Sequence, residues 1–305
     1  KNALGASYLD MMILFRLASS TVYDVFHSTV ASITRRIAMP GLPSAQAELQ
    51  SLALAFTTSR QPPNPLYGCV GAVDGICIEI QKPADEYGPR GFYCRKGMYA
   101  IPAQALVDAK YRFLYLSAKC TGSTPDGIAW ESSSLGMLLR RKSLPLGFWI
   151  AGDAAYPCRN GVLTPWTAGQ LLDNVFGVSR DAFNFFHSSL RMHVEQAFGM
   201  LVQRFGILWR KLSFSLPTNN SVLSACFRLH NFCVDSGESP VGTVLLTENR
   251  RVADAAFRRW FCAAQKARDD QTSGSQQGRR RDLESNNLRE QLTLDIHEMG
   301  KMRPK

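Results

Sequence analysis

The sequence predicts an α/β protein, because strand-like apolar runs alternate with amphipathic helical segments along most of its 305 residues. Three patterns carry this prediction. Residues 69–80 form a strand-like run, residues 103–119 have the pattern of a β-hairpin, and residues 187–209 have the period of a long amphipathic helix. With 45% hydrophobic residues, the chain is long enough to bury one large core or two small ones.

Charge and cysteine content narrow the functional class. The net charge of +10 is compatible with a polyanionic partner such as nucleic acid, and equally with simple solubility. The eight cysteines contain no CxxC pair and no zinc-finger spacing, which favours reduced thiols in the cytosol or nucleus and argues against structural zinc. No apolar run approaches the ~18 residues that a membrane span requires, and no secretory signal is apparent, so we expect no membrane association.

The N-terminal 60 residues are predicted to be helical. Residues 7–37 read as two helices joined near Ala18, with a capping residue for the second at Ser19, Ser20 or Thr21, and residues 44–58 read as a third helix. The first two resemble a helix-turn-helix, although ordinary helix packing would produce the same pattern. The turn-rich residues 60–65 then mark a domain boundary.

The strand-like run 69–80 has a carboxylate in its middle. Asp74 shares one strand face with Val70, Ala72, Ile76, Ile78 and Ile80. An ionised carboxylate in apolar surroundings needs a compensating partner, which could be a metal ion or a hydrogen bond from its own turn, since Gly75 follows immediately.

Two further acidic residues also lie in or at the end of apolar segments. After the hairpin, residues 125–142 suit one helix, and the apolar run LGFWIAGD then ends in Asp153, as if at the end of a buried strand. In the helix 187–209, Glu195 shares a face with Phe198 and Gly199; it could be a ligand or the partner of Arg191 in an inward salt bridge. A helix at 221–234 with His230 reads as core, and residues 271–287 read as a flexible linker.

The three acids Asp74, Asp153 and Glu195 together predict a metal site. Oxygen ligands are those that Mg²⁺ prefers, and two such ions would support in-line displacement at a phosphodiester.

The chain resembles the PIF/Harbinger-type DDE transposases in several motifs that occur in the family's order. They are GAVDG at 71–75, RKG at 95–97, QALVD at 104–108, GDAAYP at 152–157, LTP at 163–165 and RMHVEQAFG at 191–199. The similarity covers about residues 67–234. It implies an RNase H-like core: a mixed five-stranded sheet flanked by helices, with the first Asp on the first strand, the second after the fourth strand, and the Glu on a later helix.

Carried over residue by residue, the resemblance implies that Asp74, Asp153 and Glu195 are the catalytic acids and ligands of two Mg²⁺ or Mn²⁺ ions. Asp126 stands where the family has a His-Asp-Ser triplet. Here the His and Ser are replaced, so Asp126 is either a further metal ligand or a charge at a helix N-terminus. The implied domains are a helical segment at 1–60, the DDE catalytic domain at 67–234, a helical extension at 235–270, and a flexible linker and C-terminal tail at 271–305.

The implied function is a DNA endonuclease and strand transferase that cleaves at transposon ends and joins the 3′-OH to target DNA. A domesticated nuclease without transposition, and a non-catalytic DNA- or protein-binding adaptor, are alternatives. Resemblance further implies a Myb/SANT-like DNA-binding partner and a nuclear location, with homo-oligomerisation also open. Phosphate contacts are expected from basic residues along the chain: Arg95, Lys96, Arg140, Arg141, Lys142, Arg204, Arg210 and Lys211.

Overall fold

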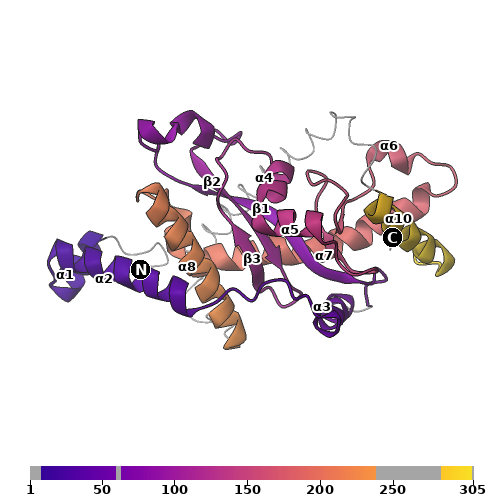
Figure 1. The fold of residues 1–305 in the computed structure, drawn as a ribbon, viewed down its shortest axis with the longest axis horizontal. Helices are drawn as coiled ribbons and strands as arrows, with labels where there is room; N and C mark the ends of the chain where they lie inside the picture. The colour runs from indigo at the N-terminus through magenta and orange to yellow at the C-terminus, as the bar shows by residue number, and fades with distance from the viewer. Residues whose placement is uncertain (1–7, 60–62, 238–282, 304–305) are drawn as a thin grey trace.

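A mixed five-stranded sheet forms the centre of the molecule, with helices on both faces (Figure 1). The computed structural model describes residues 8–59, 63–237 and 283–303. Its strands are β1 (Cys69–Glu79), β2 (Ala100–Val107), β3 (Phe113–Ser117), β4 (Trp149–Ala151) and β5 (Val162–Leu163). They lie in the order β3-β2-β1-β4-β5, with β2 antiparallel to β1 and to β3, and β4 parallel to β1 and to β5. The predicted α/β class and RNase H-like sheet are confirmed.

Helices cover this sheet and extend beyond it at both ends. In chain order they are α1 (Tyr8–Phe15), α2 (Ser19–Arg36), α3 (Gln46–Thr58), α4 (Asp126–Ser132), α5 (Ser134–Arg141), α6 (Ala168–Leu171), α7 (Gly177–Arg204), α8 (Leu216–Asp235) and α10 (Leu283–Glu298), with 3₁₀ turns η1 (Asp85–Tyr87), η2 (Pro89–Phe92) and η3 (Gly206–Trp209). In Figure 1, α1 and α2 lie at one end of the molecule and α10 lies at the other.

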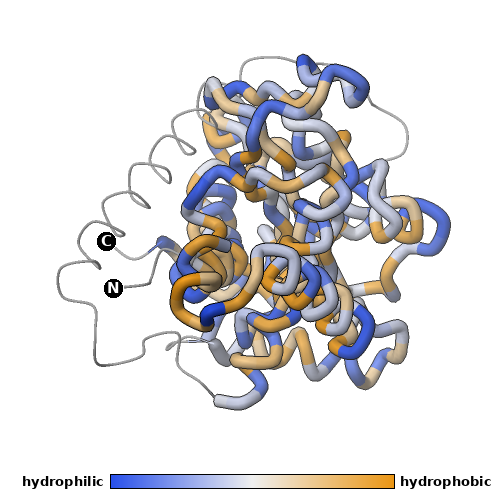
Figure 2. Tube along the Cα trace, turned by 90° about the vertical axis from the view of Figure 1, so that its left-hand side faces the viewer, coloured by the Kyte–Doolittle hydropathy of each residue, from blue (hydrophilic) through white to orange (hydrophobic). Residues whose placement is uncertain are grey.

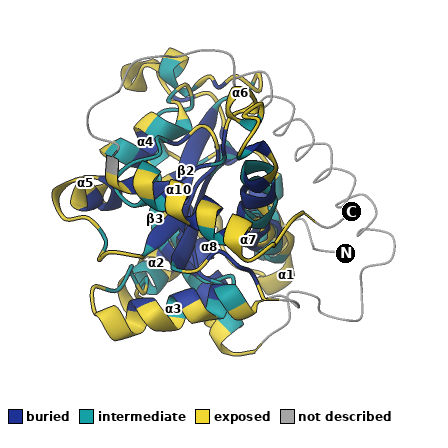
Figure 3. Cartoon of the chain, turned by 90° about the vertical axis from the view of Figure 1, so that its right-hand side faces the viewer, coloured by how far each residue is buried: buried dark blue, intermediate teal, exposed yellow. Residues whose placement is uncertain are grey.

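The two faces of the sheet carry separate hydrophobic clusters. Ala72 and Ile76 of β1 pack in the cluster that includes residues of α7 and α8, whereas Val73 packs with residues of α3, α4 and α5. Because side chains alternate along a strand, the even-numbered residues around Asp74 face α7 and their odd-numbered neighbours face α4. Figure 3 shows the strands buried beneath partly exposed helices.

The predicted hairpin is confirmed as β2 and β3. Asp108 closes the connection by accepting hydrogen bonds from the backbone N–H groups of Lys110 and Arg112, at 2.8 and 2.9 Å. Tyr111 adopts a left-handed conformation with φ of 66°. An Asp that accepts from the backbone ahead of it is a common turn former.

The single helix predicted over 125–142 is wrong, because Ser133 interrupts it. The backbone of Ser133 is extended, with ψ of 154°, and its hydroxyl accepts a hydrogen bond from the N–H of Gly136 at 3.0 Å. The chain therefore ends α4 and caps α5. The long helix of the sequence prediction is α7, which begins ten residues earlier than expected, at Gly177, and ends at Arg204. The expected helix at 221–234 lies within α8, and His230 is fully buried there, as predicted.

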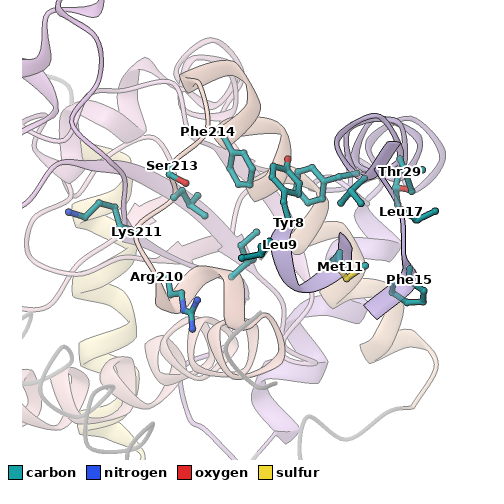
Figure 4. A pocket seen from close by; sticks show the side chains of 15 residues that line it. Tyr8, Leu9, Met11, Phe15, Leu17, Thr29, Arg210, Lys211, Ser213 and Phe214 are labelled. Carbon is teal, nitrogen blue, oxygen red and sulfur yellow. The ribbon is translucent and has the colours of Figure 1, made fainter. Parts of the chain in front are cut away.

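The N-terminal helices form where the sequence predicts them and enclose a hydrophobic cavity. Phe26 of α2 stacks on Phe214 with ring centroids 5.3 Å apart. The ring centroids of Tyr8 in α1 and Phe214 are 6.2 Å apart. The cavity, of about 760 Å³, lies between these helices and the segment 207–214, and most of its lining side chains are apolar (Figure 4). Leu9 and Phe15 of α1 are exposed, and Figure 2, seen from this end, shows hydrophobic stretches facing the viewer.

The C-terminal helix α10 packs against α7 and β5. The guanidinium of Arg289 stacks on Trp166, 3.8 Å from the ring centroid, and the indole N–H of Trp166 donates to Thr293 Oγ1 at 3.1 Å. His297 Nδ1 lies 2.9 Å from the hydroxyl of Ser179 in α7. The C-terminal part of the predicted tail is thus a docked helix, whereas most of the expected extension and linker, residues 238–282, lies outside the described residues.

Two further observations concern the described residues only. The seven cysteines among them have free thiols. No helix within the described residues is both long enough and apolar enough to cross a membrane.

Candidate active site

Asp74 lies in the middle of β1, directly opposite Ala105 of β2, and its residue is 4% exposed. One carboxylate oxygen accepts a hydrogen bond from the N–H of Gly75 at 2.8 Å. This bond, which an Asp-Gly pair would form in a turn, forms here within a continuous strand. A carboxylate this deep in a sheet needs compensation beyond one neutral donor, because the surrounding Ala and Ile side chains cannot solvate its charge.

Asp153 lies two residues beyond the end of β4, as the resemblance implied for the second Asp. The chain turns there, and the N–H of Ala155 donates to Asp153 Oδ1 at 2.9 Å. Gly152 makes this turn possible, because a Cβ at that position would lie 2.9 Å from Val162 and 3.3 Å from Tyr156. The carboxylate is therefore held by the backbone of its own turn, and the residue as a whole is 6% exposed.

Strand register and helix packing place Asp74 and Asp153 on the same side of the sheet. Ala72 of β1 pairs in parallel with Ala151 of β4, and each acid comes two residues after its paired alanine. Asp74 lies within β1, so it projects to the same face as Ala72, which α7 covers. Asp153 lies beyond the last residue of β4, and its contact with Arg191 of α7 places it on that side as well.

Glu195 reaches the same face from α7, which packs across β1, β2 and β4. Arg191, one helical turn earlier, donates from Nη2 to Glu195 Oε1 at 2.6 Å, and its Nη1 lies 3.8 Å from Asp153 Oδ2. The predicted alternative, an inward salt bridge between Arg191 and Glu195, is therefore present, and Arg191 also links Glu195 to Asp153. The side chains of Arg191, Asp153 and Glu195 are 16%, 8% and 13% exposed.

Asp126 lies on the other face of the sheet. It is the first residue of α4, and its carboxylate accepts a hydrogen bond from Gln104 Nε2 at 2.7 Å. A Cβ placed on Gly75 would lie 2.3 Å from Asp126 Oδ1, so Asp126 packs against the side of β1 opposite Asp74. The geometry does not support the prediction that Asp126 shares a metal with the other acids, because the strand lies between them. The alternative, an acid in the first turn of a helix, describes its position.

Gln104 organises this second cluster. Its side chain joins Asp126 to Tyr156, whose hydroxyl donates to Gln104 Oε1. Gln104 is 1% exposed and is the polar residue in the middle of the apolar strand AIPAQALV. The signal that singled out Asp74, a polar group inside an apolar strand, would also have found Gln104.

The donor set of the three acids suits a hard divalent cation, because all its ligand atoms are carboxylate oxygens in a largely buried setting. Among the described residues, however, no three His, Cys, Asp or Glu side chains are gathered closely enough to form a metal-binding group. Arg191 lies between two of the acids and supplies a positive charge there. The three acids therefore suit a divalent cation in their chemistry. In this structure the guanidinium of Arg191 compensates part of their negative charge.

The basic residues expected to contact phosphate divide into two groups. Arg204 is half-buried and shares a hydrogen bond with His230 Nδ1 at 3.1 Å, and Lys211 pairs with Glu79 at 3.7 Å. Lys211 is exposed despite this pairing, and so are the remaining six: Arg95, Lys96, Arg140, Arg141, Lys142 and Arg210. The cavity between α1, α2 and the segment 207–214 has Arg210 and Lys211 as its charged lining residues and contains none of the three acids.

The mixed sheet, with an acid on its first strand, an acid after its fourth strand and an acid on the helix that crosses it, defines an RNase H-like endonuclease domain. A family model described as DDE superfamily endonuclease matches residues 73–231, just over half of the chain, and the chain belongs to this family.

Two curated relatives agree with this assignment. Protein ALP1-like from Arabidopsis thaliana is 25% identical over 265 residues, covering 81% of this chain and 61% of that protein. Putative nuclease HARBI1 from Mus musculus is 24% identical over 216 residues, covering 70% of this chain and 58% of that protein. The chain thus spans about six tenths of the length of these relatives, and no solved structure gives a significant match. The predicted resemblance to PIF/Harbinger-type transposases and the nucleases derived from them is confirmed.

Proposed function

We propose that this chain is a metal-dependent DNA endonuclease in which Asp74, Asp153 and Glu195 bind two Mg²⁺ or Mn²⁺ ions. The observation that carries the proposal is the convergence of three acids from β1, the end of β4 and α7 on one face of the sheet. The parallel pairing of Ala72 with Ala151, two residues before each aspartate, and the bridge from Arg191 to Asp153 and Glu195 support this proposal. Membership of the DDE superfamily endonucleases supports the same assignment.

The contributions of the chain follow from its geometry. Bound divalent ions supply an activated water and charge stabilisation for in-line displacement at a phosphodiester. Asp74 is positioned by the pairing of β1 with β2, and Asp153 is held by the N–H of Ala155. Glu195 is carried by a 28-residue helix. The burial of the three acids keeps bulk water from screening them, which strengthens every electrostatic interaction at the site.

DNA binding is assigned to the exposed basic side chains. Arg95, Lys96 and the run 140–142 would contact phosphates, which position the duplex without reading its sequence. Such contacts release counterions, so the affinity should fall steeply with salt. We further propose that the cleaved 3′-OH is joined to target DNA; the resemblance to transposases supports this step.

The wider setting is proposed on the same resemblance. It comprises action in the nucleus on transposon ends and target DNA, a Myb/SANT-like DNA-binding partner, and assembly into a homo-oligomer. If the purified chain alone bound transposon ends tightly at physiological salt, the need for such a partner would be refuted.

The test is nicking of supercoiled plasmid in Mn²⁺ by variants that change charge and little else. Asp74→Asn, Asp153→Asn and Glu195→Gln should each lower the nicking rate by at least about 100-fold, because each removes an anionic ligand. Binding of DNA should be retained, as measured by fluorescence anisotropy.

Asp126→Asn is the matched control, since it removes a carboxylate from the opposite face of the same strand. It should keep most of the nicking activity. Full activity of the Asp74 or Glu195 variant would refute the proposal, and loss of activity in the Asp126 variant would return that residue to the site.

A further inference from the structure

The position of Arg191 raises a question that the proposed function leaves open. Its guanidinium contacts one oxygen of each of two carboxylates, Glu195 Oε1 and Asp153 Oδ2, that would hold a cation at this site. The contact is bridging: one nitrogen is directed to an acid on its own helix, and the other to an acid beyond β4.

A bridge of this kind suits an arginine. The two Nη groups of a guanidinium point in fixed directions and can serve two acceptors at once, which a lysine ammonium on a flexible stem does less well. Glu195 lies four residues after Arg191, so the first contact is built into the helix. The second contact depends on how α7 packs on the sheet, and it connects the helix to the turn that holds Asp153.

The charges explain why the bridge is needed. Asp153 and Glu195 are both largely buried, and two neighbouring negative charges in such a setting repel each other strongly. Arg191 offsets this repulsion. A divalent ion would offset it as well, and an ion and a guanidinium that share these two carboxylates weaken each other's binding, because their positive charges repel.

We propose that Arg191 is the built-in counter-cation of the acidic site, competing with the metal for Asp153 and Glu195, so that a divalent ion binds only as the guanidinium withdraws. Arg191 is thus a positioning residue that stabilises the metal-free state and lowers metal affinity. This inference rests on the proposed function, because it assumes that these acids bind metal.

A static structural role makes the opposite prediction. If Arg191 merely aligned Asp153 and Glu195, its removal would disorder the acids and weaken metal binding. If Arg191 competes with the metal, its removal strengthens metal binding while destabilising the metal-free protein. The sign of the change in metal affinity therefore separates the two roles.

The experiment measures Mn²⁺ binding by isothermal titration calorimetry and thermal unfolding in EDTA, using the full chain. Arg191→Met keeps the length and apolar stem of the side chain and removes its charge. We expect this variant to unfold at a lower temperature in EDTA and to bind Mn²⁺ about tenfold more tightly than the wild type, as for removal of one partly buried competing charge. Arg159→Met is the matched control, because Arg159 forms a partly buried bridge with Glu131, Nε to Oε1 at 2.7 Å, outside the three acids. It should lower the unfolding temperature without changing Mn²⁺ affinity.

Arg191→Lys provides a second variant in case the Met variant does not fold. It keeps the positive charge but lacks the two Nη groups that contact both carboxylates at once. Its Mn²⁺ affinity should therefore lie between those of the wild type and the Met variant. Unchanged or weaker Mn²⁺ binding by folded Arg191 variants, with wild-type binding that depends on Glu195, overturns the counter-cation alone. Absence of any Glu195-dependent Mn²⁺ binding overturns both this inference and the proposed function.

Discussion

A glycine within a β-strand lets side chains from other elements pack directly against the backbone. Gly75 shows this at the scale of single residues, because Asp126 and Gln104 occupy the space above its missing side chain. Gly75 therefore lies between two acidic side chains, Asp74 on one face of the sheet and Asp126 on the other. The hydrogen-bonded cluster of Asp126, Gln104 and Tyr156 depends on the absence of a Cβ at this position.

Gly75→Ala should destabilise the protein by roughly 1–3 kcal/mol, because the added Cβ would lie 2.3 Å from Asp126 Oδ1 and 2.6 Å from Gln104 Nε2. The effect should shrink in an Asp126→Ala background, which removes the nearer atom. Urea denaturation of the two single variants and the double variant measures this coupling. Gly169→Ala in α6, where a Cβ would meet nothing within 4 Å, is the control. Equal losses in both backgrounds would contradict the proposed contact.

His187 gives the fold an acid-sensitive residue. It lies in α7, stacks on Trp149 at 5.9 Å between ring centroids, and places Nε2 3.0 Å from the carbonyl of Leu163. Burial, helped by the nearby charge of Arg191, lowers the pKa of His187 from 6.5 to about 3. The unfolded chain therefore takes up a proton that the folded protein refuses, and stability falls as the pH drops from about 6.5 towards 3.

The expected size of this effect can be measured. Between pH 7.5 and pH 5, His187 should account for a loss of about 2 kcal/mol in the free energy of unfolding. His187→Gln, which can still donate to Leu163, should lose that much less over the same interval in urea denaturation. A variant whose stability falls as steeply as that of the wild type would show that other groups cause the acid sensitivity.

At the scale of elements, the short strand β4 matters more than its three residues suggest. Its parallel pairing with β1 fixes the level at which Asp153 leaves the sheet, and therefore its position next to Asp74. The long helix α7 contributes both Glu195 and Arg191 from successive turns. The candidate site is thus a product of strand register and helix packing, and no loop supplies more than one of its acids.

The break between α4 and α5 provides a test of element boundaries. Ser133 is 2% exposed and caps α5 through Gly136. Ser133→Ala should destabilise the protein by about 1 kcal/mol, since it leaves this N–H without its acceptor. Ser143→Ala, at an exposed position outside any helix, should change stability by less than about 0.5 kcal/mol. Chemical denaturation of both variants makes the comparison, and equal effects would rule out a capping role for Ser133.

Elements with a strong local pattern could be predicted from the sequence. The alternation around Asp74 gave β1, and the turn residues before Arg112 gave the hairpin. The break at Ser133 was missed because apolar spacing continues through it. The two-residue strand β5 was missed because Val162 and Leu163 lie among turn residues, and only their pairing with β4 makes them a strand.

At the scale of the whole molecule, the sequence indicated which acids matter but not the face on which each lies. Asp74, Asp153 and Glu195 were singled out by their apolar surroundings, and the structure brings them to one face. Asp126 was grouped with them by resemblance, but it lies on the other face because α4 packs there. Spacing along a chain carries no information about the side of a sheet on which a helix will pack.

The dependence of the site on α7 has a consequence for the newly made protein. During translation, β1 and β4 leave the ribosome well before Glu195 and Arg191 do. A nascent chain at that stage has Asp74 and Asp153 without Glu195 and Arg191, so on the proposed mechanism it cannot cut nucleic acid. On this mechanism, the chain becomes able to cut nucleic acid only after α7 has been synthesised.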